Sequence, residues 1–127
     1  MDNIIINGKV IDTEVAITEE EHRVGLMYRH KLPSAMAFPF KRAEHTKFWM
    51  YNTPCPLDIV FSRKNKIIYI CAGKPYSLNL VGPDEPSDLV VELPSGTADR
   101  LGIKQGDSIL LKYSKETLAK KYTNYLE

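Results

Sequence analysis

Short apolar runs separated by turn-forming residues recur along the chain, and this pattern predicts a fold built mainly from β-strands. The runs that we expect to form strands cover residues 4–6, 9–17, 37–40, 47–51, 57–61, 66–72, 89–93 and 108–113. Asn7 and Gly8 stand between the first two runs and favour a tight hairpin turn. Many short strands with few helices are typical of a small β barrel or of a compact α+β fold.

Two short internal segments carry helix signals. Thr18 and Glu21 have the spacing of a capping box, in which each side chain accepts a hydrogen bond from the other residue's backbone N–H. We expect the helix that follows to run to about Met27. A second helix is expected to begin at Ser95 and to end at Gly102, because glycine readily takes the left-handed conformation of a helix cap.

A third helix, amphipathic and C-terminal, is expected over about residues 114–126. The side chains that give this segment an apolar face at helical spacing are Leu118, Tyr122 and Tyr125 or Leu126. No internal repeat and no Gly/Ser-rich linker marks a boundary, so we expect one domain over residues 1–127. A chain of 127 residues is long enough for one hydrophobic core and too short for two domains.

The charge balance excludes some classes of partner. With 17 Lys and Arg against 16 Asp and Glu, the formal net charge is only +1, so no basic excess points to nucleic acid. No apolar run approaches the ~20 residues of a membrane span. We therefore expect no nucleic-acid partner and no membrane association, and the sequence predicts no particular oligomeric state.

The two cysteines, Cys55 and Cys71, are too few for a disulfide framework and lack CxxC spacing. The first eight residues also lack the basic start and long apolar stretch of a signal peptide. Both features predict a cytoplasmic protein with free thiols. The histidines, three in number, have no metal-ligand spacing, so no metal and no cofactor is predicted.

Asp58 and Glu92 are the most informative polar residues, because each is a lone carboxylate in an apolar run. A buried carboxylate needs a partner or stays protonated, and Arg29, with its forked donors, is the partner that we expect. One interpretation is an ion pair that stabilises the fold. The alternative is an acid and base pair of the kind that cleaves glycosidic bonds.

Trp49 and Asn52 lie in a second informative segment. Strand alternation separates Phe48 and Met50 from Trp49 and Tyr51, so one of these pairs must face the core. An exposed Trp49 could stack on a sugar or a base, with Asn52 supplying an amide for recognition. The alternative is that both faces are buried and that Asn52 bonds its own turn.

Four blocks of sequence resemble a known family. They are Thr18–Arg29, Ala35–Phe38, Phe48–Asp58, and Val91–Ala98 continued by Gly102–Asp107. In this order they are similar to the GLMxR, GMLF, FWMxNTxxPLD and ExPxGTA…GIxxGD motifs of the small prokaryotic family called domain of unknown function 192. The resemblance covers about residues 10–111. It implies a small closed β barrel with short helices and no established activity. Many relatives carry an export or lipid-anchor segment, which we do not expect here.

These observations favour a small-ligand binding or accessory module. Its ligand would be small and polar, such as a sugar, and the candidate ligand-binding residues are Arg29, Trp49, Asn52, Asp58 and Glu92. One alternative is a hydrolase that acts on a carbohydrate or glycan with Asp58 and Glu92 as catalytic residues. Another is a structural or interaction protein that works through its C-terminal helix.

Overall fold

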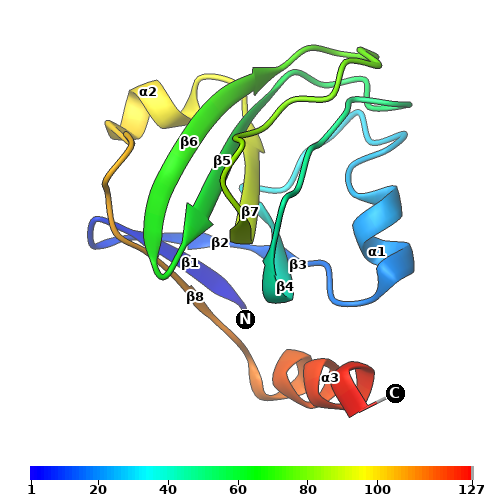
Figure 1. The fold of residues 1–127 in the computed structure, drawn as a ribbon, viewed down its shortest axis with the longest axis vertical. Helices are drawn as coiled ribbons and strands as arrows, with labels where there is room; N and C mark the ends of the chain where they lie inside the picture. The colour runs from blue at the N-terminus through cyan, green and yellow to red at the C-terminus, as the bar shows by residue number, and fades with distance from the viewer. Residues whose placement is uncertain (127) are drawn as a thin grey trace.

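The computed structural model describes residues 1–126 and shows a mainly β fold with two sheets and three short helices (Figure 1). The smaller sheet has the order β2-β1-β8, with bounds β1 Asn3–Ile6, β2 Lys9–Asp12 and β8 Ile109–Lys112. The larger sheet has the order β3-β4-β7-β5-β6, with bounds β3 Glu14–Val15, β4 Met36–Glu44, β5 Leu57–Arg63, β6 Lys66–Gly73 and β7 Ser87–Pro94. The helices are α1 Glu19–Val24, α2 Thr97–Leu101 and α3 Lys115–Leu126.

The expected closed barrel is wrong, because the two sheets do not join into one. They meet at one corner through a single bridge between Lys66 and Ser108. At the other side the expected strand over residues 9–17 breaks at Thr13, and its second part pairs with β4 instead of continuing beside β1. This second part, β3, is only two residues long and belongs to the larger sheet alone.

Both faces of the larger sheet are buried, so the core has two parts. On the inner face, which packs against the smaller sheet, Val60, Val91 and Leu93 meet Ile4 and Ile109. The opposite face, which we call the site face, carries the second cluster of buried side chains, including Phe38, Ile59, Phe61 and Val90. The central strands therefore carry apolar residues on both sides, as strands that are covered on both faces do.

The local signals near the N-terminus are confirmed. Asn7 and Gly8 take positive φ values of 51° and 78° between β1 and β2. The capping box is present: the Thr18 hydroxyl accepts from Glu21 N at 3.1 Å, and Glu21 Oε1 accepts from Thr18 N at 3.0 Å. Helix α1 ends earlier than expected, at Val24, because Gly25 turns the chain away.

The strand expected over residues 47–51 is not formed. Phe48 makes one isolated bridge with Val81, and Met50 N then donates to Ser77 O at 2.9 Å in place of a regular ladder. The segment instead crosses the site face as a loop, with Met50 pressed against Gly73. A Cβ atom on Gly73 would lie only 2.6 Å from Met50 Sδ, so the missing side chain allows this close approach.

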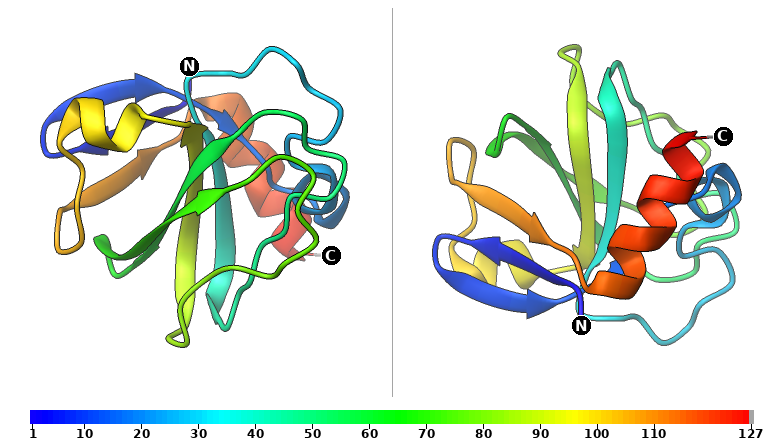
Figure 2. Two further views of the ribbon diagram at one scale, coloured as in Figure 1. Left: turned by 90° about the horizontal axis from the view of Figure 1, so that it is seen from above. Right: turned by 90° about the horizontal axis from the view of Figure 1, so that it is seen from below.

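The expected C-terminal helix is confirmed as α3, which lies alongside β4 in the right-hand view of Figure 2. Its polar contacts with the rest of the chain include those of Lys120 Nζ, which donates to Glu21 Oε2 at 2.7 Å, and of Asn124 Nδ2, which donates to Ile17 O at 3.3 Å. Leu118 and Tyr122 are exposed. The side chains of Tyr125 and Leu126 lie outside the described part of the structure. Within residues 1–126, no helix is both long and apolar enough to cross a membrane.

Candidate functional site

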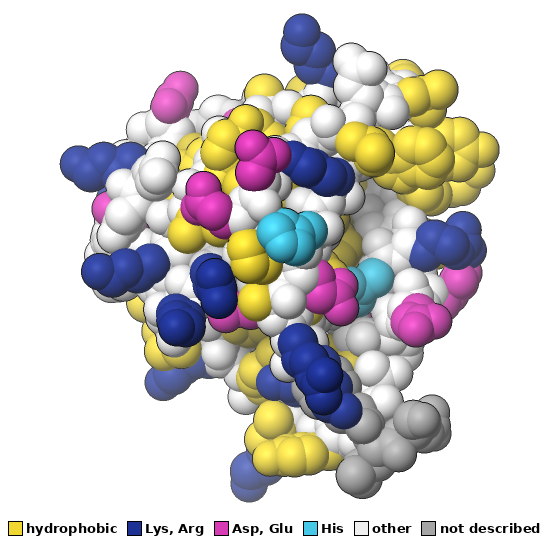
Figure 3. All heavy atoms as spheres, viewed as in Figure 1, with side chains coloured by type: hydrophobic (Ala, Val, Ile, Leu, Met, Phe, Trp, Pro, Cys, Tyr) yellow, Lys and Arg dark blue, Asp and Glu magenta, His cyan; other side chains and the backbone are white. Residues whose placement is uncertain are grey.

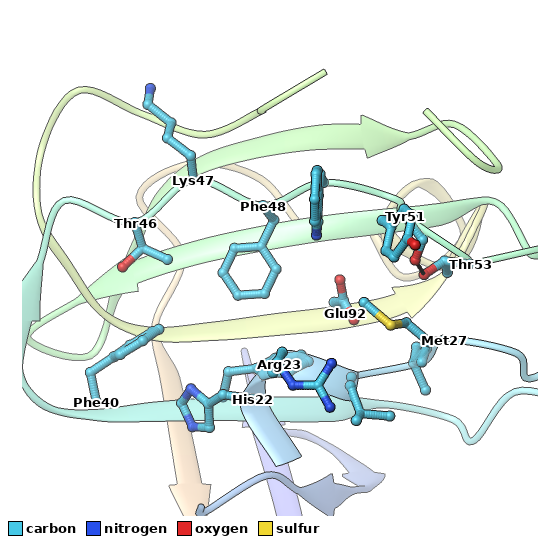
Figure 4. Close-up of a pocket in the computed structure, with 15 residues that line it drawn as sticks. His22, Arg23, Met27, Phe40, Thr46, Lys47, Phe48, Tyr51, Thr53 and Glu92 are labelled. Carbon is cyan, nitrogen blue, oxygen red and sulfur yellow. Dashed lines mark hydrogen bonds between the residues drawn. The ribbon is translucent and has the colours of Figure 1, made fainter. Parts of the chain in front are cut away.

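A cavity of about 290 Å³ lies on the site face of the larger sheet, between α1 and the loop that crosses this face (Figure 4). This volume is near the lower end of the range for small-molecule sites, about 300–1,000 Å³. Helix α1 and the turn after it form one wall, β4 and β7 form the floor, and the crossing loop forms the opposite wall. The lining residues that the site depends on are His22, Gly25, Phe38, Phe48, Trp49 and Glu92.

Glu92 is the carboxylate of this cavity. Its strand neighbours across the sheet are Met36 and Ile59, and its side chain is only 5% exposed. Among the residues that the structure describes, none donates a hydrogen bond to this carboxyl or pairs with it. Burial without a partner raises the pKa of Glu92 from 4.5 to about 8. The group is therefore protonated at neutral pH and directed into the cavity, as Figure 4 shows.

Gly25 keeps the space beside this carboxyl open. It follows α1 with φ 49° and ψ −124°, a conformation that residues with a side chain rarely adopt. A Cβ atom here would lie 3.4 Å from Phe38 Cζ and 3.9 Å from Glu92 Oε1. The capping box that starts α1 and the glycine that ends it thus place an opening above Glu92.

Aromatic side chains surround the carboxyl. Phe38 and Phe48 pack edge to face with ring centroids 5.2 Å apart, and His22 packs edge to face on both Phe38 and Phe40. At the rim, Trp49 and Tyr51 have centroids 5.0 Å apart and are 46% and 43% exposed. Figure 3 shows hydrophobic side chains gathered at the upper right, over the tip of the crossing loop in Figure 1.

His22 forms part of the wall and carries no charge at neutral pH. Its Nε2 lies 2.9 Å from Ala16 O, and burial lowers the pKa of its imidazole below 6.5. Two cations, Arg23 and Lys47, also line the cavity. Arg23 Nε donates to Glu20 Oε2 at 3.1 Å, and Lys47 Nζ donates to Gly82 O at 2.6 Å. Both cations are therefore held by acceptors outside the cavity.

The structure does not bring Asp58 and Glu92 together. Asp58 lies opposite Leu93 in the register of β5 and β7, whereas Glu92 lies opposite Ile59. Residues that face each other across a ladder share a face, so this offset of one residue puts the two carboxylates on opposite faces of the sheet. Asp58 Oδ2 instead accepts from Gly96 N at 3.1 Å and from Ala98 N at 2.9 Å.

The other two candidates also bind elsewhere. Arg29 pairs with Glu14, with its Nη1 at 2.7 Å from Glu14 Oε2, and so does not reach either expected carboxylate. Asn52 has φ 53°, and its Nδ2 donates to the Tyr28 hydroxyl at 2.7 Å. Of the five candidate residues, only Trp49 and Glu92 line the cavity.

Comparisons with known proteins agree with the sequence motifs. Residues 3–111 match the model of DUF192, a family described as "Uncharacterized ACR". The chain belongs to the DUF192 family. The fold is similar to the crystal structure of a protein of unknown function from Novosphingobium aromaticivorans, at 33% identity and TM-score 0.79, covering 85% of this chain and 83% of that one.

A second similar crystal structure comes from Sinorhizobium meliloti and carries the provisional description of transcription regulator. It is 30% identical with TM-score 0.79, and the match covers 87% of this chain and 91% of that one. No curated protein matches the chain. Gly25, Trp49 and Glu92, which line the cavity, all lie within the residues that match the DUF192 model. The described residues hold no group of three His, Cys, Asp or Glu side chains that could bind a metal ion.

Sequence reasoning missed the aromatic wall and Gly25. Phe38 and Phe40 are two residues apart, which puts them on one face of a strand, and this spacing was the available signal. His22 and Gly25 come from the turn of α1, where no local pattern indicates which strand they will meet.

We expect Asp58→Ala to lower the free energy of unfolding of this DUF192 chain by about 1–2 kcal/mol, because the N–H groups of Gly96 and Ala98 lose their acceptor. Asp58→Asn should lose clearly less, since its amide oxygen can accept the same bonds. Urea denaturation measures both. Equal losses in the two variants would contradict this structural role of Asp58.

Glu92 should make stability fall with rising pH. Below pH 4.5 its carboxyl is protonated in both states; between 4.5 and about 8 only the unfolded chain releases the proton; above 8 the loss is complete. The free energy of unfolding should thus drop by about 1.4 kcal/mol per pH unit in this window. Buried His22 acts in the opposite sense, and its effect fades as the pH rises above 6.5, where the unfolded imidazole loses its proton. Most of the slope measured by urea denaturation between pH 7 and 8 should therefore come from Glu92.

Glu92→Gln should abolish this slope, because the amide stays neutral at every pH. The matched control is Glu116→Gln, which removes a carboxylate from the exposed surface of α3 and should keep the slope. If the wild type and Glu92→Gln show the same pH dependence, Glu92 does not titrate as described.

Proposed function

We propose that this DUF192 chain is a binding module whose cavity around Glu92 holds a small ligand. The observation that carries the proposal is a carboxyl that is nearly fully buried, has no partner among the described residues and faces an open cavity. Pockets with a few convergent polar groups and a titratable group of perturbed pKa are the usual form of a ligand site.

The energetic cost of Glu92 supports a role in binding. Burying a carboxyl without a hydrogen bond costs several kcal/mol, and an apolar residue would pack against Met36 and Ile59 without this cost. No contact of the Glu92 carboxyl among the described residues therefore accounts for a gain in the stability of the fold. A ligand that bonds to the carboxyl would recover part of the cost, which links the residue to binding rather than to stability.

Binding accounts for the site better than hydrolysis does. A glycosidase of the common type needs two carboxyl groups across one cleft, and Asp58 and Glu92 face opposite sides of the sheet. The exposed rings of Trp49 and Tyr51 at the rim are suited to stacking on a small ligand, a sugar being the class that the sequence suggested.

The description of the Sinorhizobium meliloti protein as a transcription regulator agrees with a sensing role, in which an occupied cavity is the signal. The net charge of +1 argues against direct contact with DNA. We keep the cytoplasm as the proposed location, and the free thiols of Cys55 and Cys71 support it.

A thermal-shift screen tests the proposal. The full chain is heated with sugars, nucleosides, amino acids and small amines, and a ligand at a hundred times its Kd should stabilise the fold by about 2.7 kcal/mol. For a domain of this size that corresponds to a rise in Tm of roughly 5–15 °C. Glu92→Gln should lose most of the shift, whereas Glu116→Gln should keep it. If no compound gives a shift that depends on Glu92, the proposal is wrong.

A further inference from the structure

The chemistry of the cavity wall also indicates a class of ligand. Building on the binding function proposed above, we propose that the ligand is an organic cation, whose ammonium group lies against Glu92 inside the aromatic wall. Three features of the cavity lead to this assignment: a carboxyl without a counter-ion, a wall of aromatic rings, and a shortage of free hydrogen-bonding groups.

The missing counter-ion is the first feature. A buried carboxylate is normally paired, most often with Arg or Lys. Arg23 and Lys47 are the cations of the cavity wall within the described chain, and both are engaged by Glu20, Gly82 and Asp84. Figure 4 shows the Lys47 ammonium group directed away from Glu92. The chain thus leaves the positive charge opposite Glu92 to be supplied from outside.

The aromatic wall is the second feature. Phe38, Phe40, Phe48, Trp49 and Tyr51 all line the cavity that holds the carboxyl. The negative face of an aromatic ring attracts a cation within about 6 Å of its centroid, by roughly 2 kcal/mol or more when water is excluded. Several rings with a carboxylate form the kind of cage that binds quaternary and methylated ammonium groups.

The third feature is the small number of free hydrogen-bonding groups inside the cavity, which disfavours a sugar as ligand. A sugar presents several hydroxyl groups that each need a partner. The two threonine hydroxyls of the cavity are already used: Thr53 Oγ1 donates to Tyr51 O at 3.1 Å, and Thr46 Oγ1 donates to Glu44 O at 3.3 Å. Besides Glu92, the cavity offers the Trp49 indole N–H and the Tyr51 hydroxyl, and both of these residues lie at the exposed rim. The interior therefore suits a ligand with one charged end and an apolar surface.

Binding of a cation should be coupled to the ionisation of Glu92. The titratable groups on the packed elements are His22 and Arg23 on α1, Lys47 and Tyr51 on the crossing loop, and Cys71 on β6, two strands away on the site face. His22 is neutral near pH 7, and burial raises the pKa of the Cys71 thiol above 9.0. Arg23 keeps its charge, because its hydrogen bond to Glu20 raises the pKa of the guanidinium. Around pH 7 the proton released on binding should therefore come from Glu92.

The test uses choline and its neutral isostere 3,3-dimethylbutan-1-ol, which share a shape and differ in charge. Each is titrated calorimetrically into the full chain at pH 6, 7 and 8. Choline should bind at least about tenfold more tightly than the alcohol at pH 8, as one lost charge pair implies. Its affinity should rise by nearly tenfold from pH 6 to 7 and level off above 8, with about one proton released at pH 7.

Glu92→Gln should weaken choline binding by at least about tenfold and remove the pH dependence, whereas Glu116→Gln should change neither. Equal affinities for choline and the alcohol, or an affinity for choline that does not depend on Glu92, would overturn the cation as ligand. A sugar or other neutral compound that shifts Tm through Glu92 would also overturn it, but would leave the binding function intact. If neither choline nor tetramethylammonium binds, the inference fails.

Discussion

The larger sheet is covered on both faces, and this constraint determines what every side chain on its central strands must do. The inner face lies against the smaller sheet, and the site face lies under α1 and the crossing loop. A polar side chain in the middle of β5 or β7 therefore has little contact with bulk water and needs a partner or a cavity. Asp58 meets this constraint by accepting two backbone hydrogen bonds at the start of α2. Glu92 has no such partner and faces a cavity instead.

Two glycines, Gly25 and Gly73, leave room for the cavity between the larger sheet and the segments that cover it. Gly73 lets Met50 anchor the crossing loop against β6, and Gly25 ends α1 before a side chain could fill the space beside Glu92. The loop then supplies Phe48 and the rim aromatics, while the turn after α1 closes the other wall. The shape of the cavity thus depends on the backbone at these two glycines.

Local signals predicted much of the fold. The Asn7–Gly8 turn, the capping box at Thr18 and the cap at Gly102 each depend on neighbouring residues, and each is found in the structure. The closed barrel was wrong because the chain after Thr13 leaves the smaller sheet and pairs with β4, and long-range packing decides that partner. The arrangement of the candidate site residues depends on the same long-range packing. Sequence identified Glu92 as unusual, but not the register that separates it from Asp58.

The pairing of Arg29 illustrates the same limit. Its forked donors suggested a role beside a strand carboxylate, but the sequence could not show which acid lies within reach. Glu14 on the edge strand β3 is the one within reach. Only the contact between Arg29 and Glu14 shows that Arg29 does not pair with Asp58 or Glu92. The sequence alone therefore could not indicate that Glu92 is unpaired.

The measurement that tests the central claim most directly is an NMR titration of the Glu92 side-chain carboxyl carbon in the full, ligand-free chain. Burial without a partner predicts a midpoint near pH 8, well above the usual 4.5 for a glutamate. A midpoint near or below 4.5 would contradict the account, because it would mean that the carboxyl is either hydrated or already paired within the chain.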